Sequence, residues 1–512
     1  MKKVVSGAQI KELDRAAVAA GIPAEALMEN AGSGVARIVA RHAPGKRVVA
    51  ICGKGGNGGD ALVAARILVR AGFRVRAFTT APIEDMIDPT RTNARALSAL
   101  DPRAVRPLAD DLTPLMRAAA AADVVIDGLF GIGVDRPVTG RYAAVIEAIN
   151  RAPGLRVAVD LPSGLPSDSG IPIGPAVRAE LTACMAAYKP AHLLYPAREY
   201  CGRIELIPVG YPEMLWEGVV PIAQVTDESW ARDHLPGRSP AGHKGTFGRV
   251  LIVAGSLGMS GAAIMSALGA LRAGAGLVTV ACPRSILPIV GTAVPEVLTI
   301  PLPDSDGHLA PSALHPLVEA SSRVDVVAIG PGLGRAPETG TLVRSLLEEI
   351  EAPLVLDADG LYPLTARLDA LAPVAGRAVL TPHPGEMARL VGRRAEEIDA
   401  ERIEIARSFA KDHGVTLLLK GRPTAIGTPE GEVFLNPTGN TGLATGGSGD
   451  VLTGLIAGLI AGGVSPADAA VVGAYVHGRA AELLSRDRAE RSVIPRDLIQ
   501  SLPYAFKELE DA

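Results

Sequence analysis

The segment TGGSGD at residues 445–450 carries the strongest chemical signal in the sequence. Three glycines and a serine lead into an apolar helix predicted over 451–462, so backbone N–H groups at its start can hold a transferring phosphoryl group. Asp450 lies in the first turn, where its carboxylate can take a proton from a neighbouring hydroxyl. Asp450 could instead only cap the helix, but the glycine run is longer than a cap requires.

Four further loops in this half carry polar or glycine-rich motifs after apolar runs. The lysine of KGRPT (420–424) could meet a phosphate, and GPGLG (330–334) admits close approach of a ligand. A lone histidine is usually structural or exposed, but His383 lies between two prolines in LTPHPGE that hold it rigidly, which raises the odds of substrate contact. Asp357 and Asp359 in LDADGL either face Mg²⁺ or only form a turn, and the sequence leaves both readings open.

A second glycine-rich loop, GKGGNGGD at residues 53–60, lies near the start of the chain. It follows an apolar strand and opens a helix, so its amides and the helix N-terminus favour a phosphate. The GxxxxGK[ST] pattern of a P-loop is absent from the sequence. A tight turn without a ligand is the alternative for this loop.

Side-chain oxygens at three strand ends of the N-terminal half suit a hard cation. Asn57 belongs to the glycine loop, Asp127 to DGLFGIG, and Asp160 and Ser163 to DLPSG. Such loops converge at one edge of a parallel sheet, and oxygens without His or Cys favour a hard ion. Asp127 and Asp160 could alternatively cap the turns that follow them.

The elements that position these residues can be read from the sequence, where short apolar runs alternate with helical stretches in two series. This alternation predicts parallel sheets with helices on both faces, in two unlike α/β domains. We expect domains at residues 1–215 and 239–512, joined by a linker at 216–238 that is rich in proline and lacks periodicity. The expected strands include 47–53, 74–80, 123–131, 156–164, 248–256, 276–283, 325–334, 353–361, 378–386 and 416–424.

Composition narrows the classes of function. The 512 residues carry a net charge of −4 and only 3% aromatics, which disfavours nucleic-acid binding. Four scattered cysteines form no CxxC pair, so neither a disulfide framework nor a zinc site is expected. Without a signal peptide or a membrane span, we expect a soluble cytoplasmic protein.

The first half resembles the NAD(P)H-hydrate epimerase domain of bacterial NAD(P)H-hydrate repair enzymes. The resemblance rests on MENAG (28–32), GKGGNGGDALVAARIL, DGLFGIG, DLPSG and YKPAHLLYP (188–196). It implies a Rossmann-like three-layer sandwich that binds K⁺ through Asn57, Asp127 and Ser163. It also implies that the substrate contacts Gly56, Asn57, Gly58, Gly59, Asp60, Gly131, Ile132, Gly133, Val134, Asp135, Arg136, Pro137 and Asp160.

The loop departs from the family pattern NNGGDG at two positions. Gly56 replaces the first Asn and Ala61 replaces the last Gly, which puts local substrate contacts in question. Inverting a hydrated nicotinamide requires oxygen to leave and return with proton transfer, and Asp160 could serve as general acid or base. Lys189 is a second candidate for that role, with a surface or phosphate-binding lysine as the alternative.

The second half resembles the ADP/ATP-dependent (S)-NAD(P)H-hydrate dehydratases, which have a ribokinase-like α/β fold. The resemblance rests on HKGTFGRVLIVAGS, GPGLG, LDADGL, LTPHPGEMARL, LLKGRPTAI and GNTGLATGGSGDVLTG. It implies that the substrate contacts Ala262, Gly332, His383 and Asp450, and that the nucleotide contacts Lys420, Gly421, Arg422, Pro423, Thr424 and Gly449. It further implies Mg²⁺ and ADP, with AMP and phosphate as products.

Together the resemblances imply a bifunctional repair enzyme that epimerises NADHX and NADPHX and dehydrates the S epimer. We expect small-molecule partners only and a homo-oligomer. A ribokinase-like small-molecule kinase is the main alternative, and a scaffold with an inactive first domain is another. An NAD-dependent dehydrogenase is disfavoured, because no GxGxxG with a following acidic residue is present.

Overall fold

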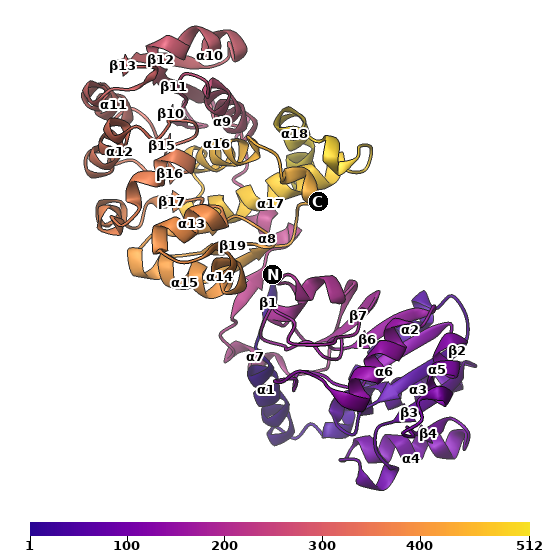
Figure 1. The fold of residues 1–512 in the computed structure, drawn as a ribbon. Coiled ribbons are helices and arrows are strands. Elements are labelled where there is room, and N and C mark those ends of the chain that lie inside the picture. The colour runs from indigo at the N-terminus through magenta and orange to yellow at the C-terminus, as the bar shows by residue number, and fades with distance from the viewer. Residues whose placement is uncertain (512) are drawn as a thin grey trace. The chain divides into compact units, whose positions relative to one another are not determined.

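The computed structural model describes residues 1–511. The chain divides into two compact units, the first spanning Lys2–Ile222 and the second beginning at Ala223 (Figure 1). Each unit is built on its own large sheet. The segment 216–238 is not featureless, because it contains part of α7 (Glu213–Glu217), the strand β9 (Ala223–Val225) and α8 (Glu228–Asp233).

The N-terminal unit contains a seven-stranded sheet in the order β4-β3-β2-β5-β6-β7-β8. Every neighbouring pair is parallel, as the buried apolar runs predict. The order reverses between β2 and β5, the kind of switch point where such sheets bind ligands. The strands are β2 (Arg47–Cys52), β3 (Arg74–Thr79), β4 (Val105–Pro107), β5 (Val124–Gly128), β6 (Leu155–Val159), β7 (Leu181–Met185) and β8 (Arg203–Ile207).

Helices cover both faces of this sheet, so the expected three-layer sandwich is confirmed. Val48 and Ala50 of β2 pack with α2, α3 and α4, whereas Val49 and Ile51 pack with α5 and α6. This alternation follows from side chains pointing to opposite faces along a strand. The helices are α1 (Gly7–Ala19), α2 (Ala24–His42), α3 (Gly56–Arg70), α4 (Thr90–Leu100), α5 (Thr113–Ala120) and α6 (Gly140–Asn150), and β1 spans Lys2–Val4.

The second unit has a sheet whose strands run in the order β9-β20-β19-β18-β17-β16-β15-β10-β11-β12. Its pairs are parallel except β18–β19 and β19–β20, which are antiparallel. The strands are β10 (Arg249–Val253), β11 (Leu277–Pro283), β12 (Leu298–Leu302), β15 (Val326–Ile329), β16 (Leu354–Leu356), β17 (Ala378–Leu380), β18 (Thr416–Leu419), β19 (Thr424–Gly427) and β20 (Val433–Asn436). A separate hairpin pairs β13 (Asp304–Ser305) with β14 (His308–Leu309).

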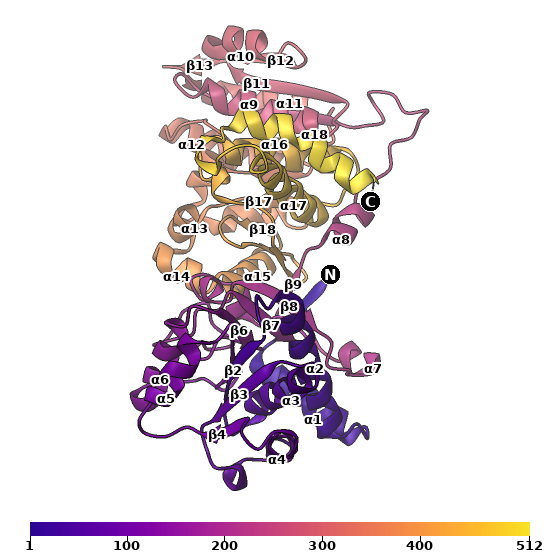
Figure 2. The ribbon, with the colours of Figure 1, turned by 90° about the vertical axis from the view of Figure 1, so that its right-hand side faces the viewer.

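Two cores lie on the opposite faces of this second sheet. Val250 and Ile252 pack with α9, α16, α17 and α18, whereas Leu251 and Val253 pack with α11, α12, α13 and α15 (Figure 2). The helices are α9 (Ser260–Arg272), α10 (Leu287–Ala293), α11 (Leu314–Ser321), α12 (Pro337–Glu349), α13 (Pro384–Val391), α14 (Ala395–Ala400), α15 (Arg402–His413), α16 (Ser448–Ala461), α17 (Pro466–Leu484) and α18 (Pro495–Asp511).

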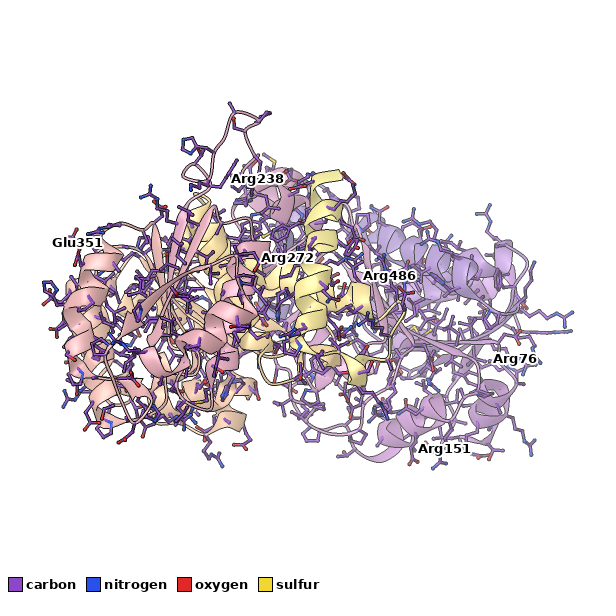
Figure 3. The ribbon with its side chains drawn as sticks, turned by 90° about the horizontal axis from the view of Figure 1, so that it is seen from above. Arg76, Arg151, Arg238, Arg272, Glu351 and Arg486 are labelled. Atoms are coloured by element: carbon purple, nitrogen blue, oxygen red, sulfur yellow. The ribbon has the colours of Figure 1, made fainter. Side chains whose placement is uncertain are left out.

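The surface carries many arginines, and several of them project into solvent from both units, such as Arg76, Arg151, Arg272 and Arg486 (Figure 3). Arg151 pairs with Glu147 and Arg486 with Glu508, both as exposed ion pairs that solvent screens. Among residues 1–511, no helix combines the length and the apolar character that crossing a membrane requires.

Candidate active sites

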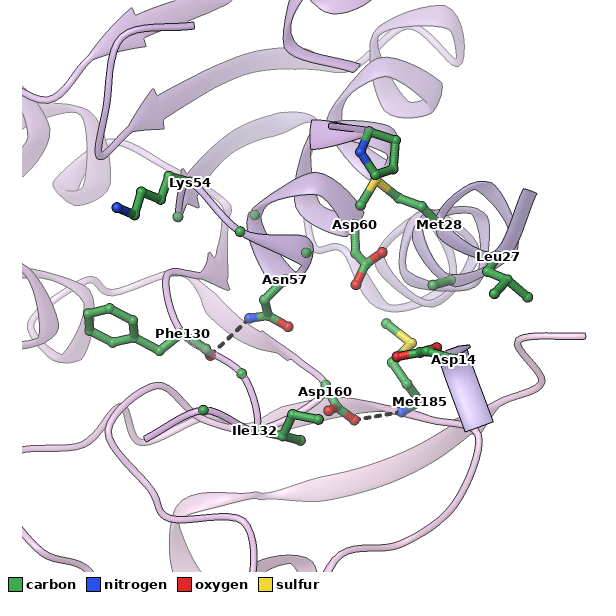
Figure 4. A pocket seen from close by; sticks show the side chains of 18 of the residues that line it. Asp14, Leu27, Met28, Lys54, Asn57, Asp60, Phe130, Ile132, Asp160 and Met185 are labelled. Atoms are coloured by element: carbon green, nitrogen blue, oxygen red, sulfur yellow. Dashed lines mark hydrogen bonds between the residues drawn. The ribbon is translucent and has the colours of Figure 1, made fainter. Parts of the chain in front are cut away.

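A cavity of about 1020 Å³ lies in the N-terminal unit. Of the expected substrate residues, Gly56, Asn57, Gly58, Asp60, Gly131, Ile132, Gly133 and Asp160 line it (Figure 4). Gly59 and residues 134–137 are not among its lining. The lining also includes Lys54 of the glycine loop and Met28 of the MENAG segment. Asp14, Leu27, Met185 and Tyr211 line it as well, and the sequence analysis did not single them out.

The glycine loop allows close approach at the start of α3. A Cβ on Gly58 would lie 1.9 Å from the Gly53 carbonyl oxygen, and one on Gly59 would lie 2.3 Å from Met28 Cε. A Cβ on Gly56 would meet nothing within 4 Å, so the backbone there does not require glycine and leaves room for the Asn of the family pattern. Ala61 is buried in the core of the unit.

Asp160 and Lys189 form a buried ion pair at this site. Lys189 Nζ lies 2.5 Å from Asp160 Oδ1 and 2.8 Å from the Met185 carbonyl oxygen, and the Met185 N–H donates to the same Oδ1. Burial lowers the pKa of Lys189, but the charge and hydrogen bond of Asp160, together with the neighbouring Cys184 and Asp14, outweigh it and the pKa is raised. Lys189 is fully buried, so the surface-lysine alternative is wrong.

His192 fixes the backbone around this ion pair. Its Nδ1 accepts the Lys189 N–H at 3.0 Å, and its Nε2 donates to the Asp160 carbonyl at 2.7 Å. Burial lowers the pKa of His192 to about 4, so the ring is neutral. Cys184 lies nearby, but both ring nitrogens of His192 are already occupied, which argues against a metal centre. Asp160 itself adopts the left-handed region, with φ 61°.

Two further carboxyl groups share the cavity with Asp160. Asp14 on α1 accepts a hydrogen bond from the Tyr211 hydroxyl at 2.5 Å. Burial raises the pKa of Asp60 well above its usual range, and the charges of Asp160 and Asp14 raise it further. The cavity therefore has one strongly acidic side, as Figure 4 shows around these three residues.

The structure brings the three expected cation ligands together at the ends of β5 and β6. Ser163 Oγ donates to Asp127 Oδ1 at 2.6 Å, and the Ser163 N–H donates to Oδ2 at 2.8 Å. Asn57 Nδ2 donates to the Phe130 carbonyl, and the Phe130 N–H donates to Ser163 Oγ. Burial raises the pKa of Asp127 to about 6, and no basic side chain contacts it among residues 1–511.

The second site lies at the start of α16, which begins at Ser448 within the glycine motif. Gly447 precedes it with φ 95°, a conformation that favours glycine. First-turn amides at a helix N-terminus lack intrahelical partners and can bind an anion. Asp450 lies in this turn, and burial together with Asp357 raises its pKa to about 6. Above that pH its carboxylate is ionised and can accept a proton.

A pair between the partly buried Lys420 and the buried Asp357 lies beside this helix. Lys420 Nζ is 2.8 Å from Asp357 Oδ1 and 3.9 Å from Glu386 Oε2. Thr453 Oγ1 donates to Asp357 Oδ2 at 2.7 Å, which ties the end of β16 to α16. A Cβ on Gly449 would lie 3.3 Å from Lys420 Nζ, so the glycine loop and the lysine are in contact. Asp357 therefore does more than form a turn.

The remaining expected contacts lie on neighbouring loops. His383 caps α13, because its Nδ1 accepts the N–H groups of Gly385 and Glu386 while the ring remains half exposed. A Cβ on Gly332 would lie 2.8 Å from Ala262 Cβ, so these two residues touch. Residues 420–423 form the turn between β18 and β19, Thr424 begins β19, and the buried Arg402 donates to the Pro423 carbonyl.

Several of these residues escape sequence reasoning. Asp14 reaches the first cavity only because α1 packs beside it, and Tyr211 follows from no motif. Thr453 lies inside an apolar helix, where a threonine carries no distinct signal. Glu386 stands in the HPGE segment, three residues after His383, where its capping contact with the His383 N–H could have been inferred.

Comparisons with known proteins agree with this division. A family model described as YjeF-related protein N-terminus matches residues 24–191, and one described as NAD(P)H-hydrate dehydratase matches residues 250–504. A ribokinase-like superfamily protein from Enterococcus faecalis is 26% identical, with a TM-score of 0.50 over 57% of this chain and 98% of its own. This supports the ribokinase-like fold of the second unit.

Relatives match the chain along nearly its whole length. The bifunctional NAD(P)H-hydrate repair enzyme of Moorella thermoacetica is 43% identical, covering 99% of this chain and 97% of its own. The enzyme of the same name from Thermofilum pendens is 37% identical, with 99% and 97% covered. Identity at this level across both units shows that the chain belongs to the family of bifunctional NAD(P)H-hydrate repair enzymes.

Proposed function

We propose that the N-terminal unit interconverts the R and S epimers of NADHX and NADPHX, and that the second unit dehydrates the S epimer. ADP is the expected phosphoryl donor, giving AMP and phosphate. The proposal rests chiefly on Asp450, which lies at a glycine-started helix beside Lys420 and Asp357. Residues 1–215 form the epimerase domain, 216–238 the linker and 239–512 the dehydratase domain.

The epimerase cavity supports one orientation of the substrate. Lys54 and the glycines before α3 lie on one side of it, whereas the side chains of Asp14, Asp60 and Asp160 lie towards the other (Figure 4). The glycine loop and the N-terminus of α3 suit the pyrophosphate. The hydrated nicotinamide then meets the acidic side, where Asp160 exchanges a proton with the ring hydroxyl or with water.

A potassium ion fits the ends of β5 and β6. Asp127 is a fully buried carboxylate with no basic partner among the described residues, and a monovalent cation would neutralise it. Asn57, Asp127 and Ser163 offer oxygen ligands there, the donors that a hard cation prefers. When bound, the ion would order the first turn of α3 and the turn that follows β6.

The dehydratase reaction follows from the second site. Asp450 removes the proton of the ring hydroxyl, and that oxygen attacks the terminal phosphoryl group of the nucleotide. The first-turn amides of α16 and Lys420 stabilise the charge on the phosphoryl oxygens. Phosphate then leaves with the C–O bonding electrons while the lone pair of the ring nitrogen forms a C=N bond. Loss of a proton from the neighbouring ring carbon then forms the C=C bond of NAD(P)H and returns the lone pair to the nitrogen. A Mg²⁺ ion would neutralise the nucleotide phosphates, and the buried carboxylate of Asp357, already one of the two Mg²⁺ candidates in the sequence, would help to hold it.

The setting of this activity is the cytoplasm, where the reduced cofactors are used. The partners are small molecules, and the net charge of −4 fits the absence of nucleic acid. We also propose that the protein forms a homo-oligomer, as its resemblance to the family implies.

An assay with purified (S)-NADHX and Mg²⁺ shows whether ADP or ATP is the phosphoryl donor. We expect ADP to yield AMP in a ratio of one to each NADH formed, with ATP slower. Lys420→Met should weaken nucleotide use, whereas the exposed Lys507→Met should not. Failure of both nucleotides to release NADH would refute the dehydratase assignment and favour a kinase of this fold.

A further inference from the structure

The epimerase cavity contains a second carboxyl group, that of Asp60, whose neighbours differ in charge from those of Asp160. Asp160 is held by the ammonium of Lys189 at 2.5 Å and by the Met185 N–H. Asp60 has neither an ion pair nor a side-chain hydrogen bond among residues 1–511, and Asp14 and Asp160 face it as like charges. Figure 4 shows Asp60 and Asp160 pointing into the same space from different elements.

Such a difference divides proton donors from proton acceptors in enzyme sites. Lys189 stabilises the ionised form of Asp160 and leaves its Oδ2 without a hydrogen bond among the described residues, facing the cavity. Nothing comparable stabilises an ionised Asp60. One cavity thus holds one carboxyl group in an ion pair with a lysine and one without a cationic partner among residues 1–511.

We propose that Asp60 is a second catalytic residue of the epimerase, acting as the proton donor opposite Asp160. The proposal rests on the epimerase function proposed above. Lys189 is a positioning residue, since it acts on the substrate only through Asp160. The raised pKa of Asp60, caused by burial and then by its acidic neighbours, agrees with this assignment.

The step balances without a further reactant. Asp60 gives its proton to the hydroxyl oxygen, the C–O bond breaks, and its electron pair leaves with a water molecule. The ring nitrogen lone pair forms a C=N bond, and the anionic Asp160 stabilises the cation. Water adds to the opposite face of the ring and its proton passes to Asp160. The other epimer reacts in reverse, from the form with Asp160 protonated and Asp60 ionised.

The pH dependence of this step involves every titratable group that faces Asp60. These are Asp14, Asp160 and Tyr211, with Lys189 behind Asp160. Burial raises the pKa values of Tyr211 and Asp60 alike, so Tyr211 stays neutral throughout. The alkaline limb of the profile therefore reports loss of the Asp60 proton.

The test uses the full-length enzyme, purified (R)-NADHX and no nucleotide, with the epimers separated by chromatography. Asp60→Asn keeps the shape of the side chain but donates no acidic proton. We expect kcat to fall by about 10²–10⁴-fold with KM changed less than about threefold. Asp60→Glu should restore at least about a tenth of kcat and shift the alkaline limb. The exposed Asp110→Asn is the matched control and should match wild type.

The outcomes separate the two proposals. A wild-type rate no faster than spontaneous epimerisation would refute the epimerase function itself. Wild-type activity with kcat retained in Asp60→Asn would overturn only the role of Asp60. Calorimetry of the full-length Asp60→Asn protein shows whether its N-terminal unit still folds. If that variant fails to fold, the Glu variant decides, and an unchanged alkaline limb would overturn the proposal.

Discussion

The buried carboxylate of Asp127 should make the stability of the N-terminal unit depend on potassium and pH together. Its pKa rises from 3.8 to about 6 because burial outweighs the hydrogen bonds from Ser163. A shift of about two units corresponds to about 3 kcal/mol. A carboxyl group with a raised folded-state pKa contributes stability at low pH, and this contribution is lost as the pH rises through about 6.

The perturbation replaces KCl by choline chloride at equal ionic strength. At pH 8 the ionised Asp127 should cost the unit up to about 3 kcal/mol without potassium, which calorimetry would record as a fall of about 5–10 °C in Tm. At pH 5 Asp127 is mostly protonated and potassium must displace that proton, so the potassium effect should be smaller there by about 1.4 kcal/mol. Asp127→Asn should remove the potassium effect. An equal potassium effect at both pH values, or one that survives in the variant, would refute this reasoning.

Three other outcomes follow from the geometry. Asp450→Asn should lower the kcat of (S)-NADHX dehydration by about 10²–10⁴-fold, while nucleotide binding measured by calorimetry changes little. The wild-type dehydration rate should rise with pH through about 6, as Asp450 ionises, and a flat profile there would contradict its role as base. Gly58→Ala should destabilise the N-terminal unit by at least about 2 kcal/mol in urea unfolding, because its Cβ would meet the Gly53 carbonyl, whereas Gly56→Ala should be tolerated.

The strand pattern was the part of the fold that the sequence predicted best. The run at 47–53 becomes β2 over Arg47–Cys52, and the run at 416–424 contains β18 at Thr416–Leu419. Buried parallel strands are continuous apolar runs, so local composition suffices to find them. The antiparallel turn at residues 420–423 was not predicted, because pairing direction depends on partners elsewhere in the chain.

A site residue could be predicted from the sequence where it belongs to a short motif in the loop or helix start that forms the site. Asp450 and Asp160 follow this rule, since each lies in a short segment at a strand end or a helix start. Lys189 was a candidate in the sequence, but its burial and its ion pair could not be predicted, because they depend on the tertiary placement of Asp160 and Met185. Asp14 could not be predicted either, because it reaches the cavity from a helix without any motif.

Recovery of NADH absorbance from a mixed R and S NADHX preparation, with ADP, Mg²⁺ and K⁺, tests the central claim most directly. Wild type should recover all of the NADH. Asp160→Asn should stop near the S fraction at the pace of spontaneous epimerisation, and Asp450→Asn should recover none. Complete recovery by either variant at the wild-type rate, or no recovery by wild type, would contradict the assignment of two repair activities to this chain.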